Sequence, residues 1–158
     1  MSTKSSPPAT EILVLQAFGR AKLKLAELAV ETCKPLGLGP LQAGLVRRLG
    51  ELKTASLAEL SRLMGLDPAA IGRAVDTLIK KGWVLRIDHP SDRRRWQLSL
   101  SPKGLKLLAR VQAQYAKIAA QFCGSLGAAD CKALLKLLNQ VEAGLDAKAP
   151  KGLTHEKG

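Results

Sequence analysis

Apolar residues recur at intervals of three and four over most of the chain, which predicts a mainly helical protein. The first such segment covers residues 10–32 and ends before Pro35, Gly37 and Gly39. Its apolar stripe is formed by Ile12, Leu15, Phe18, Leu25 and Leu28. Pro40 is a good first helical residue, so we expect a second helix to begin there.

Two further helices are marked by their capping residues. Ser56 and Glu59 form an S-x-x-E capping box, and Gly65 is placed to end the short helix that follows. Asp67-Pro68 then combines an N-cap residue with a proline at the first helical position. We expect this helix to run to about Lys81, with Gly82 closing it.

Residues 83–100 depart from the helical spacing and predict a β-hairpin. Residues 83–88 and 95–100 have the alternating pattern of strands, and the polar residues 89–94 between them predict a charged tip. The alternating apolar positions are Leu85 and Ile87 on the first strand, and Trp96, Leu98 and Leu100 on the second.

The last part of the chain predicts two helices separated by Gly124 and Gly127, the first capped by Ser101-Pro102. Their apolar positions are Leu108, Val111, Tyr115, Ile118 and Phe122, followed by Leu134, Leu138, Val141 and Leu145. Seams of this kind pack against partner helices, so we expect them to support a homodimer. Residues 1–9 and 147–158 are small and polar, which predicts disordered tails.

The charge of the chain narrows the class of partner. Its 158 residues include 25 Lys and Arg against 13 Asp and Glu, a formal charge of +12. This excess favours a polyanion, either nucleic acid or an acidic membrane surface. No apolar run approaches the length of a membrane span, and residues 1–9 lack the apolar core of a leader. We therefore expect a cytoplasmic protein with no membrane partner.

Two helices joined across Gly65, followed by a hairpin, are typical of a winged helix-turn-helix. The helix from Asp67 to Lys81 has an apolar face suited to a core, and its other face can meet base edges in a major groove. The candidate DNA-binding residues on that face are Ala69, Ala70, Arg73 and Thr77. Free N–H groups around Ala69 and Ala70 could also meet a phosphate. Arg73 could instead pair with Asp76.

The hairpin tip carries three consecutive arginines, Arg93, Arg94 and Arg95. Arginine is drawn to the negative potential of a narrow minor groove, so we expect these residues to contact DNA. Asp92 lies two residues before Arg94 and could orient its guanidinium, although aspartate in a turn also bonds its own backbone.

Residues 38–104 resemble the DNA-binding domain of the MarR family of bacterial regulators. The resemblance rests on the segments Leu38-Gly39-Pro40-Leu41-Gln42, Ser56-Leu57-Ala58-Glu59-Leu60, Asp67-Pro68 through Leu78, Asp88 through Arg95, and Leu98 through Gly104. The last two are similar to the family's D-x-R wing and its "LT-x-x-G" helix start, with Ser101 in place of threonine. Ala69, Ala70 and Gly72 depart from the serine or threonine that the family often has early in the recognition helix.

The resemblance implies a homodimer that reads a pseudo-palindromic operator in double-stranded DNA. Residues 10–36 and 102–146 would form the dimerisation helices around the winged domain, 38–104. It also implies release from the operator, as a repressor, by a small aromatic carboxylate held between the two regions. Candidate anion partners for such an effector are Arg20, Lys22, Lys24 and Arg47.

Other classes of function have weaker support in the sequence. His89 and His155 cannot be placed beside a cysteine or a carboxylate pair, and no glycine-rich phosphate loop occurs, so we expect no enzyme, cofactor or metal site. An architectural nucleic-acid-binding module without an effector remains an alternative. A protein-interaction module is a third, which the charge and the Arg-rich wing disfavour.

The three cysteines leave a redox-sensing regulator open as a further alternative. Cys33 precedes Lys34, whose charge could lower the thiol pKa. Cys123 and Cys131 lie eight residues apart, a spacing that matches no metal site known to us. Buried or incidental cysteine is the simpler interpretation of all three.

Overall fold

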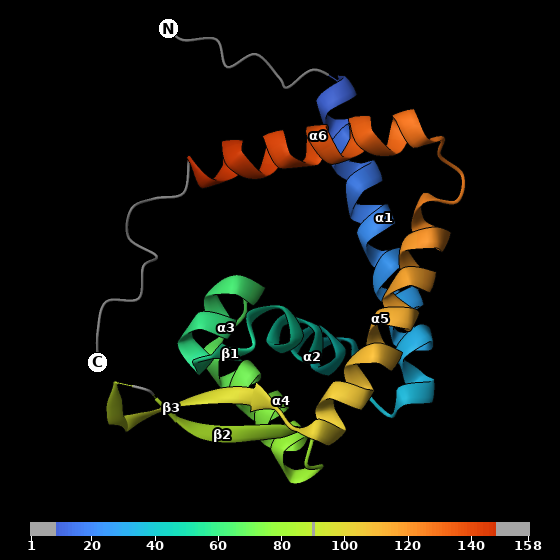
Figure 1. Cartoon of the computed structure of the whole chain (residues 1–158). Coiled ribbons are helices and arrows are strands. Elements are labelled where there is room, and N and C mark those ends of the chain that lie inside the picture. The colour runs from blue at the N-terminus through green and yellow to red at the C-terminus, as the bar shows by residue number, and fades with distance from the viewer. Residues whose placement is uncertain (1–8, 90, 148–158) are drawn as a thin grey trace, which may run out of the picture. The chain divides into compact units, whose positions relative to one another are not determined.

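The computed structural model describes residues 9–89 and 91–147, without the side chains of residues 89 and 92–95. Its elements are α1 (Ala9–Cys33), η1 (Lys34–Leu36), α2 (Pro40–Leu52), β1 (Thr54–Ala55), α3 (Leu57–Met64), α4 (Pro68–Lys80), β2 (Val84–His89), β3 (Asp92–Leu100), α5 (Pro102–Cys123) and α6 (Ala128–Asp146). The predicted mainly helical fold with a small hairpin is confirmed (Figure 1). Helix α1 begins at Ala9, inside the predicted N-terminal tail, and Ala147 of the predicted C-terminal tail is the C-cap of α6; the rest of both tails, residues 1–8 and 148–158, lies outside the described residues.

The predicted helix boundaries of the winged domain follow from their caps. The Ser56 hydroxyl accepts from the Glu59 N–H at 3.2 Å, and the Glu59 carboxylate accepts from the Ser56 N–H at 3.3 Å. Gly65 ends α3 in the left-handed conformation, with a φ of 62°. These contacts satisfy backbone groups that a helix end would otherwise leave unpaired, and they fix the turn between α3 and α4.

The sheet is larger than the predicted hairpin and its tip is shorter. β1 pairs with β3, which gives an antiparallel sheet of order β1-β3-β2. With only two residues, β1 is too short to leave an alternating pattern in the sequence. β3 begins at Asp92 rather than Arg95, so the prediction of a polar tip over 89–94 is wrong in its extent. The ladder continues to His89 and Asp92 because a register irregularity after Asp88 absorbs the mismatch.

The inward face of β2 is also different from the predicted alternation. Val84 is fully buried, whereas Leu85 is 45% exposed. Val84 lies opposite Leu100, and Leu85 lies opposite the polar Ser99. Successive residues of a strand point to opposite faces, so a shift of one residue exchanges the buried and the exposed face. Because Val84 and Leu85 are both apolar, the sequence pattern did not show which of them faces the core.

The core of the winged domain joins α2, α3, α4 and the sheet. Its largest fully buried side chains are Leu45, Leu49, Leu60, Ile71, Leu78 and Leu98. In Figure 1, α2, α3 and α4 lie together beside the sheet, and the β2–β3 hairpin extends away from them. Leu107 and Val111 of α5 belong to the same core cluster, so α5 is anchored on this domain at its N-terminal end.

Two glycine positions allow α5 to approach the domain closely. A Cβ at Gly104 would lie 2.0 Å from the Trp83 carbonyl oxygen, and a Cβ at Gly50 would lie 2.5 Å from a Leu108 methyl carbon. The glycine of the "L-S-P-K-G" segment is therefore required by a backbone contact. The Ser101 hydroxyl completes the junction by donating to the Gly82 carbonyl at 2.6 Å and accepting from the Gly104 N–H at 2.9 Å.

The chain divides into two compact units, one up to Ile118 and one from Ala119 onward. The second unit contains the end of α5 and all of α6, in which no residue is buried. Of the helices in the described part of the chain, none is both long enough and apolar enough to cross a membrane.

Candidate nucleic-acid interface

Helix α4 has the two faces that a recognition helix needs. Its buried residues are Ile71, Ala74, Val75 and Leu78. Its outward face exposes Ala69, Arg73, Asp76 and Lys80, at intervals of four, three and four. Ala70 and Thr77, which were also predicted to contact DNA, are half-buried at the edge of this face.

Arg73 is exposed and makes no ion pair or hydrogen bond through its side chain with any described residue. The alternative in which it pairs with Asp76 is wrong, because Asp76 accepts from Arg86 of β2 at 3.0 Å instead. The guanidinium of Arg73 therefore keeps its five donors for another molecule.

The first turn of α4 is less open to phosphate than predicted. The Asp67 carboxylate accepts from the Ala70 N–H at 3.1 Å, so the prediction of a free N–H at Ala70 is wrong. Pro68 has no N–H, which leaves Ala69 as the uncapped donor of that turn. Thr77 donates its hydroxyl proton to the Arg73 carbonyl at 3.0 Å and keeps only acceptor capacity.

The wing carries the predicted arginines on the backbone of β3. Asp92, Arg93, Arg94 and Arg95 all lie within that strand, and their side chains are outside the described residues. DNA contact by these arginines, and an orienting role for Asp92, therefore stay predictions. Behind them, the Arg86 guanidinium lies over the Trp96 ring at 4.6 Å, a contact that the sequence pattern did not indicate.

A second group of contacts fixes the C-terminal end of α4. The Lys81 ammonium donates to the Gly37 carbonyl at 3.0 Å, and the Lys103 ammonium donates to the Lys81 carbonyl at 2.9 Å. Both ammonium groups lie near the Trp83 ring, at 4.9 and 5.7 Å from its centroid. This group ties the end of α4 to the segment after α1 and to the start of α5.

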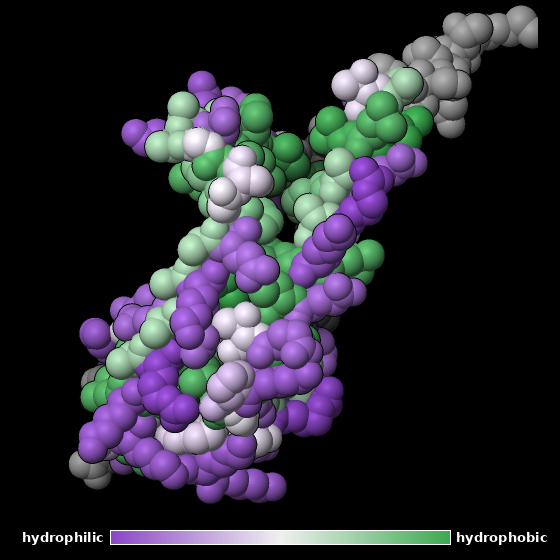
Figure 2. Space-filling model, turned by 90° about the vertical axis from the view of Figure 1, so that its right-hand side faces the viewer, coloured by the Kyte–Doolittle hydropathy of each residue, from purple (hydrophilic) through white to green (hydrophobic). Residues whose placement is uncertain are grey.

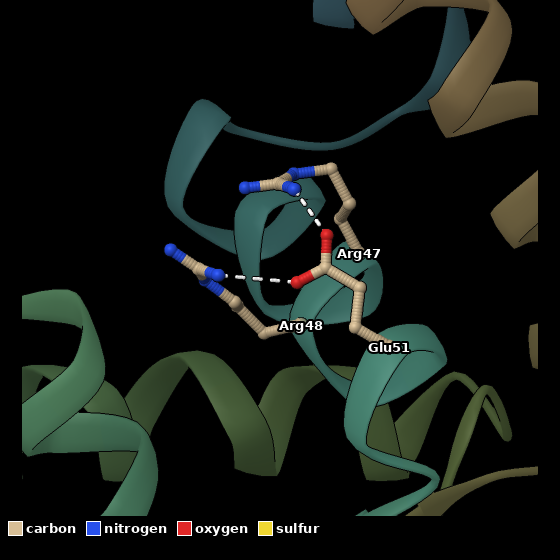
Figure 3. Close-up of polar contacts among 3 residues, drawn as sticks. All are labelled: Arg47, Arg48 and Glu51. Carbon is tan, nitrogen blue, oxygen red and sulfur yellow. Dashed lines mark hydrogen bonds and ion pairs between the residues drawn. The ribbon is translucent and has the colours of Figure 1, made fainter.

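A basic cluster lies on α2, where two arginine side chains reach the same glutamate (Figure 3). Arg47 and Arg48 both pair with Glu51, the second at 3.1 Å. The Arg47 guanidinium also lies over the Tyr115 ring of α5, at 4.6 Å. The Nε atoms of both arginines are buried and have no hydrogen-bond partner among the described residues.

Two of the three cysteines, Cys33 and Cys131, have a thiol pKa above its ordinary value. Burial raises the pKa of the Cys33 thiol, which is opposite to the predicted lowering by Lys34, and the Lys34 ammonium pairs with Glu31. Desolvation also raises the pKa of Cys131, with smaller contributions from Cys123 and Asp130. A protonated thiol is a poor nucleophile, so the burial of Cys33 disfavours redox sensing at that position. Among the described residues, no group of three or more His, Cys, Asp or Glu could hold a metal ion.

Comparisons with known proteins agree with this geometry. A sequence model of the MarR family matches residues 38–96. YcgE, an uncharacterised HTH-type transcriptional regulator of Bacillus subtilis, is 31% identical over 113 residues, 70% of this chain and 73% of that protein. Sco3205, a MarR family regulator from Streptomyces coelicolor solved in complex with DNA, is 26% identical with a TM-score of 0.79. That likeness covers 89% of this chain and 94% of Sco3205.

A third likeness shows the fold alone. BpsR of Bordetella bronchiseptica, whose DNA binding is regulated by 6-hydroxynicotinic acid, is 21% identical with a TM-score of 0.74. It covers 82% of this chain and 98% of that one.

The capped helix pair, the outward face of α4 and the three-stranded wing define a winged helix-turn-helix DNA-binding protein. The chain belongs to the MarR family and is a DNA-binding transcriptional regulator.

Proposed function

We propose that the protein is a dimeric repressor that binds a pseudo-palindromic operator and is released by a small aromatic carboxylate. The observation that carries the proposal is the free guanidinium of Arg73, exposed on the outward face of α4. Arg73 would read a major groove, where arginine pairs with guanine O6 and N7. The arginines of the wing, Arg93, Arg94 and Arg95, would enter the adjacent minor groove.

Supporting contacts on α4 come from the smaller residues. The methyl groups of Ala69 and Ala70 suit apolar contact with a thymine methyl, and Thr77 can accept one hydrogen bond. Asp92 would orient Arg94 from two residues away in β3. With one free arginine and two alanines on the helix, much of the specificity would come from the wing and from DNA shape.

The dimer is supported by apolar surface that the chain leaves uncovered. Ile12, Leu13, Val14 and Leu15 of α1 are between 43 and 72% exposed, and Figure 2 shows apolar colour gathered at that end of the helix. On α6, Leu135, Leu137, Val141 and Leu145 are between 57 and 66% exposed. Patches of this kind mark protein interfaces. A second copy would cover them and bring two winged domains to one operator.

The effector proposal is supported by Arg47 and Tyr115. An aromatic acid could pair its carboxylate with Arg47, in competition with Glu51, and place its ring beside Tyr115. The other candidate cations, Arg20, Lys22 and Lys24, lie exposed on α1. The fold relative BpsR responds to 6-hydroxynicotinic acid, an aromatic carboxylate, which favours the same class of ligand here. Such a ligand would act only if it binds one arrangement of the dimer better than the other.

The DNA part of the proposal is tested by two alanine variants on one operator duplex. Arg73→Ala should relax the preference among major-groove sequences, by about 1–3 kcal/mol at the base that it reads. Arg94→Ala should weaken all sequences alike and should lower the slope of log affinity against log salt. Fluorescence anisotropy over a salt series measures both. Wild-type discrimination and salt dependence in both variants would refute this docking mode.

The effector part is tested by titrating the protein–operator complex with benzoate, salicylate and nicotinate derivatives. We expect release in the millimolar range, and a loss of this response in Arg47→Gln with operator affinity kept. Lys117→Gln is the matched control because it removes an exposed cation of α5 that is not a candidate partner of the effector. If none of the acids lowers operator affinity, the carboxylate proposal fails, and oxidation of Cys33 becomes the next input to test.

A further inference from the structure

Three side chains from three elements meet between the recognition helix and the wing. Arg86 of β2 donates to the Asp76 carboxylate of α4 at 3.0 Å. The same guanidinium lies over the Trp96 ring of β3, 4.6 Å from its centroid. One planar side chain therefore contacts the helix through its edge and the hairpin through its face.

These contacts are too exposed to matter much for folding. The side chains of Arg86 and Asp76 are 53 and 57% exposed, and Trp96 is 37% exposed. Surface ion pairs of this kind contribute little to the stability of a domain. The core below them already holds α4 and the sheet together through fully buried residues such as Ile71, Leu78 and Leu98.

Asp76 is an unfavourable residue for its position if it acts alone. It lies on the outward face of α4, three residues after Arg73, where a carboxylate would meet the negative potential of DNA. Arg86 neutralises this charge and has no other ion pair within the described residues. A carboxylate kept at such a place needs a role that outweighs the repulsion.

We propose that Asp76, Arg86 and Trp96 are positioning residues that hold the wing at a fixed angle to the recognition helix. The proposal rests on the docking mode above, in which α4 and the wing engage neighbouring grooves at once. A wing fixed before binding loses less conformational freedom when the complex forms, so its arginines bind more tightly. Arginine suits this role because its planar group can bond a carboxylate and stack on an aromatic ring together.

The test is the sign of the effect of Asp76→Asn on operator affinity. Removal of a negative charge from a DNA-facing helix should strengthen binding if electrostatics alone decide. The positioning role predicts the opposite, a loss of about tenfold, in the range of coupling between contacting residues. Asp88→Asn is the matched control, because Asp88 is an exposed carboxylate of the wing, opposite Trp96 in the ladder, and its side chain makes no hydrogen bond or ion pair with any described residue. We expect that control to bind as tightly as the wild type or more tightly.

Two further variants separate positioning from direct DNA contact by Arg86. Arg86→Lys keeps the charge but loses the planar stacking, so it should recover only part of the affinity that Arg86→Ala loses. The exchange of Asp76→Arg with Arg86→Asp restores the pair and should bind more tightly than either single variant. Thermal unfolding of every variant should remain close to that of the wild type.

A readout without DNA separates this proposal from the docking mode on which it rests. In a Trp83→Phe background, Trp96 is the sole tryptophan, and Asp76→Asn should change its emission and its quenching by acrylamide. If the emission changes but Asp76→Asn, Arg86→Ala and Arg73→Ala all bind operator as tightly as the wild type, the docking mode is wrong. Unchanged emission would overturn the positioning role. The role would also be overturned if Asp76→Asn binds operator as tightly as the wild type while Arg86→Ala and Arg73→Ala both bind weakly.

Discussion

The winged domain and the terminal helices bury their aliphatic residues in different ways. In the winged domain, Leu45, Leu60 and Leu98 are completely buried within one chain. Helix α6 has no buried residue, and α1 has only Cys33, although both helices are rich in leucine and alanine. The same composition therefore completes a core in one region and leaves exposed apolar faces in the other. This difference is what we expect if the winged domain folds within one chain and, as proposed above, the terminal helices pack against a second copy.

Helix α5 belongs to both regions, which corrects the sequence interpretation of its seam. Val111 and Ile118 are 2 and 8% exposed, so these seam positions are covered by the chain itself. The absence of side chains at Gly50 and Gly104 allows α5 to pack closely against the winged domain. The spacing of apolar residues in the sequence does not predict this contact. Of the seam positions, Tyr115 and Phe122 remain 48 and 40% exposed, so they are available to a second copy.

The largest effect is expected where α5 contacts the winged domain. Gly104→Ala would place a methyl group 2.0 Å from the Trp83 carbonyl oxygen, which only a backbone shift can relieve. We expect a loss of about 3 kcal/mol in the free energy of unfolding, measured by urea denaturation. The matched control is Gly144→Ala in α6, where no described atom other than the adjacent residues and the helix's own backbone lies within 4 Å of the added methyl. Helix propensity should make that control neutral or more stable, and equal effects of the two variants would break the comparison.

The next effect concerns the exposed apolar faces. Leu15→Glu in α1 and Leu145→Glu in α6 change residues that are 72 and 66% exposed and would cost a monomer little. If a second copy covers them, each change acts twice in the dimer, so the dissociation constant should rise at least about 100-fold. Sedimentation over a concentration series measures this change. Leu63→Glu in α3, at 41% exposure, should leave the oligomeric state as it is.

The smallest effect is expected at Cys33, the one buried residue of α1, where this helix meets the core of the winged domain. Burial raises the pKa of this thiol above its ordinary value of 9.0, so the fold favours the protonated form. The stability that this thiol contributes is therefore full below pH 9 and is lost as the pH rises through the raised pKa. Cys33→Ala should cost about 1 kcal/mol at neutral pH, and the difference from the wild type should shrink above pH 9. A difference that stays constant to pH 11 would show that the thiol does not titrate with the fold.

Most of the fold could be predicted because its signals are local. The capping box at Ser56, the Asp67-Pro68 start and the glycine stop at Gly65 depend on neighbouring residues, and all three are confirmed. β1 could not be predicted, since two residues carry no period and the strand exists only through its pairing with β3. The prediction of which β2 residues face the core was wrong for a related reason. Whether Val84 or Leu85 is buried depends on the pairing with β3, which places Val84 opposite Leu100.

The candidate site was predictable in its location and less so in its contacts. The outward position of Arg73 followed from helical period, and the structure places it there. The pairing of Asp76 with Arg86 joins residues ten apart, and the placement of Arg47 over Tyr115 joins α2 to α5. Such contacts depend on how elements pack, so the sequence suggested Arg73 as the partner of Asp76 and did not indicate Tyr115 at all.

The central proposal is that the winged domain folds within one chain and that the terminal helices assemble the dimer. The stoichiometry of the operator complex tests it most directly. The measurement is sedimentation velocity of the full chain with a labelled duplex whose half-sites lie about 10 base pairs apart, alone and over a protein titration. We expect a dimer without DNA, and two chains that bind one duplex in a single step. Monomers that bind one chain per duplex, with the same affinity for a duplex that carries only one half-site, would contradict it.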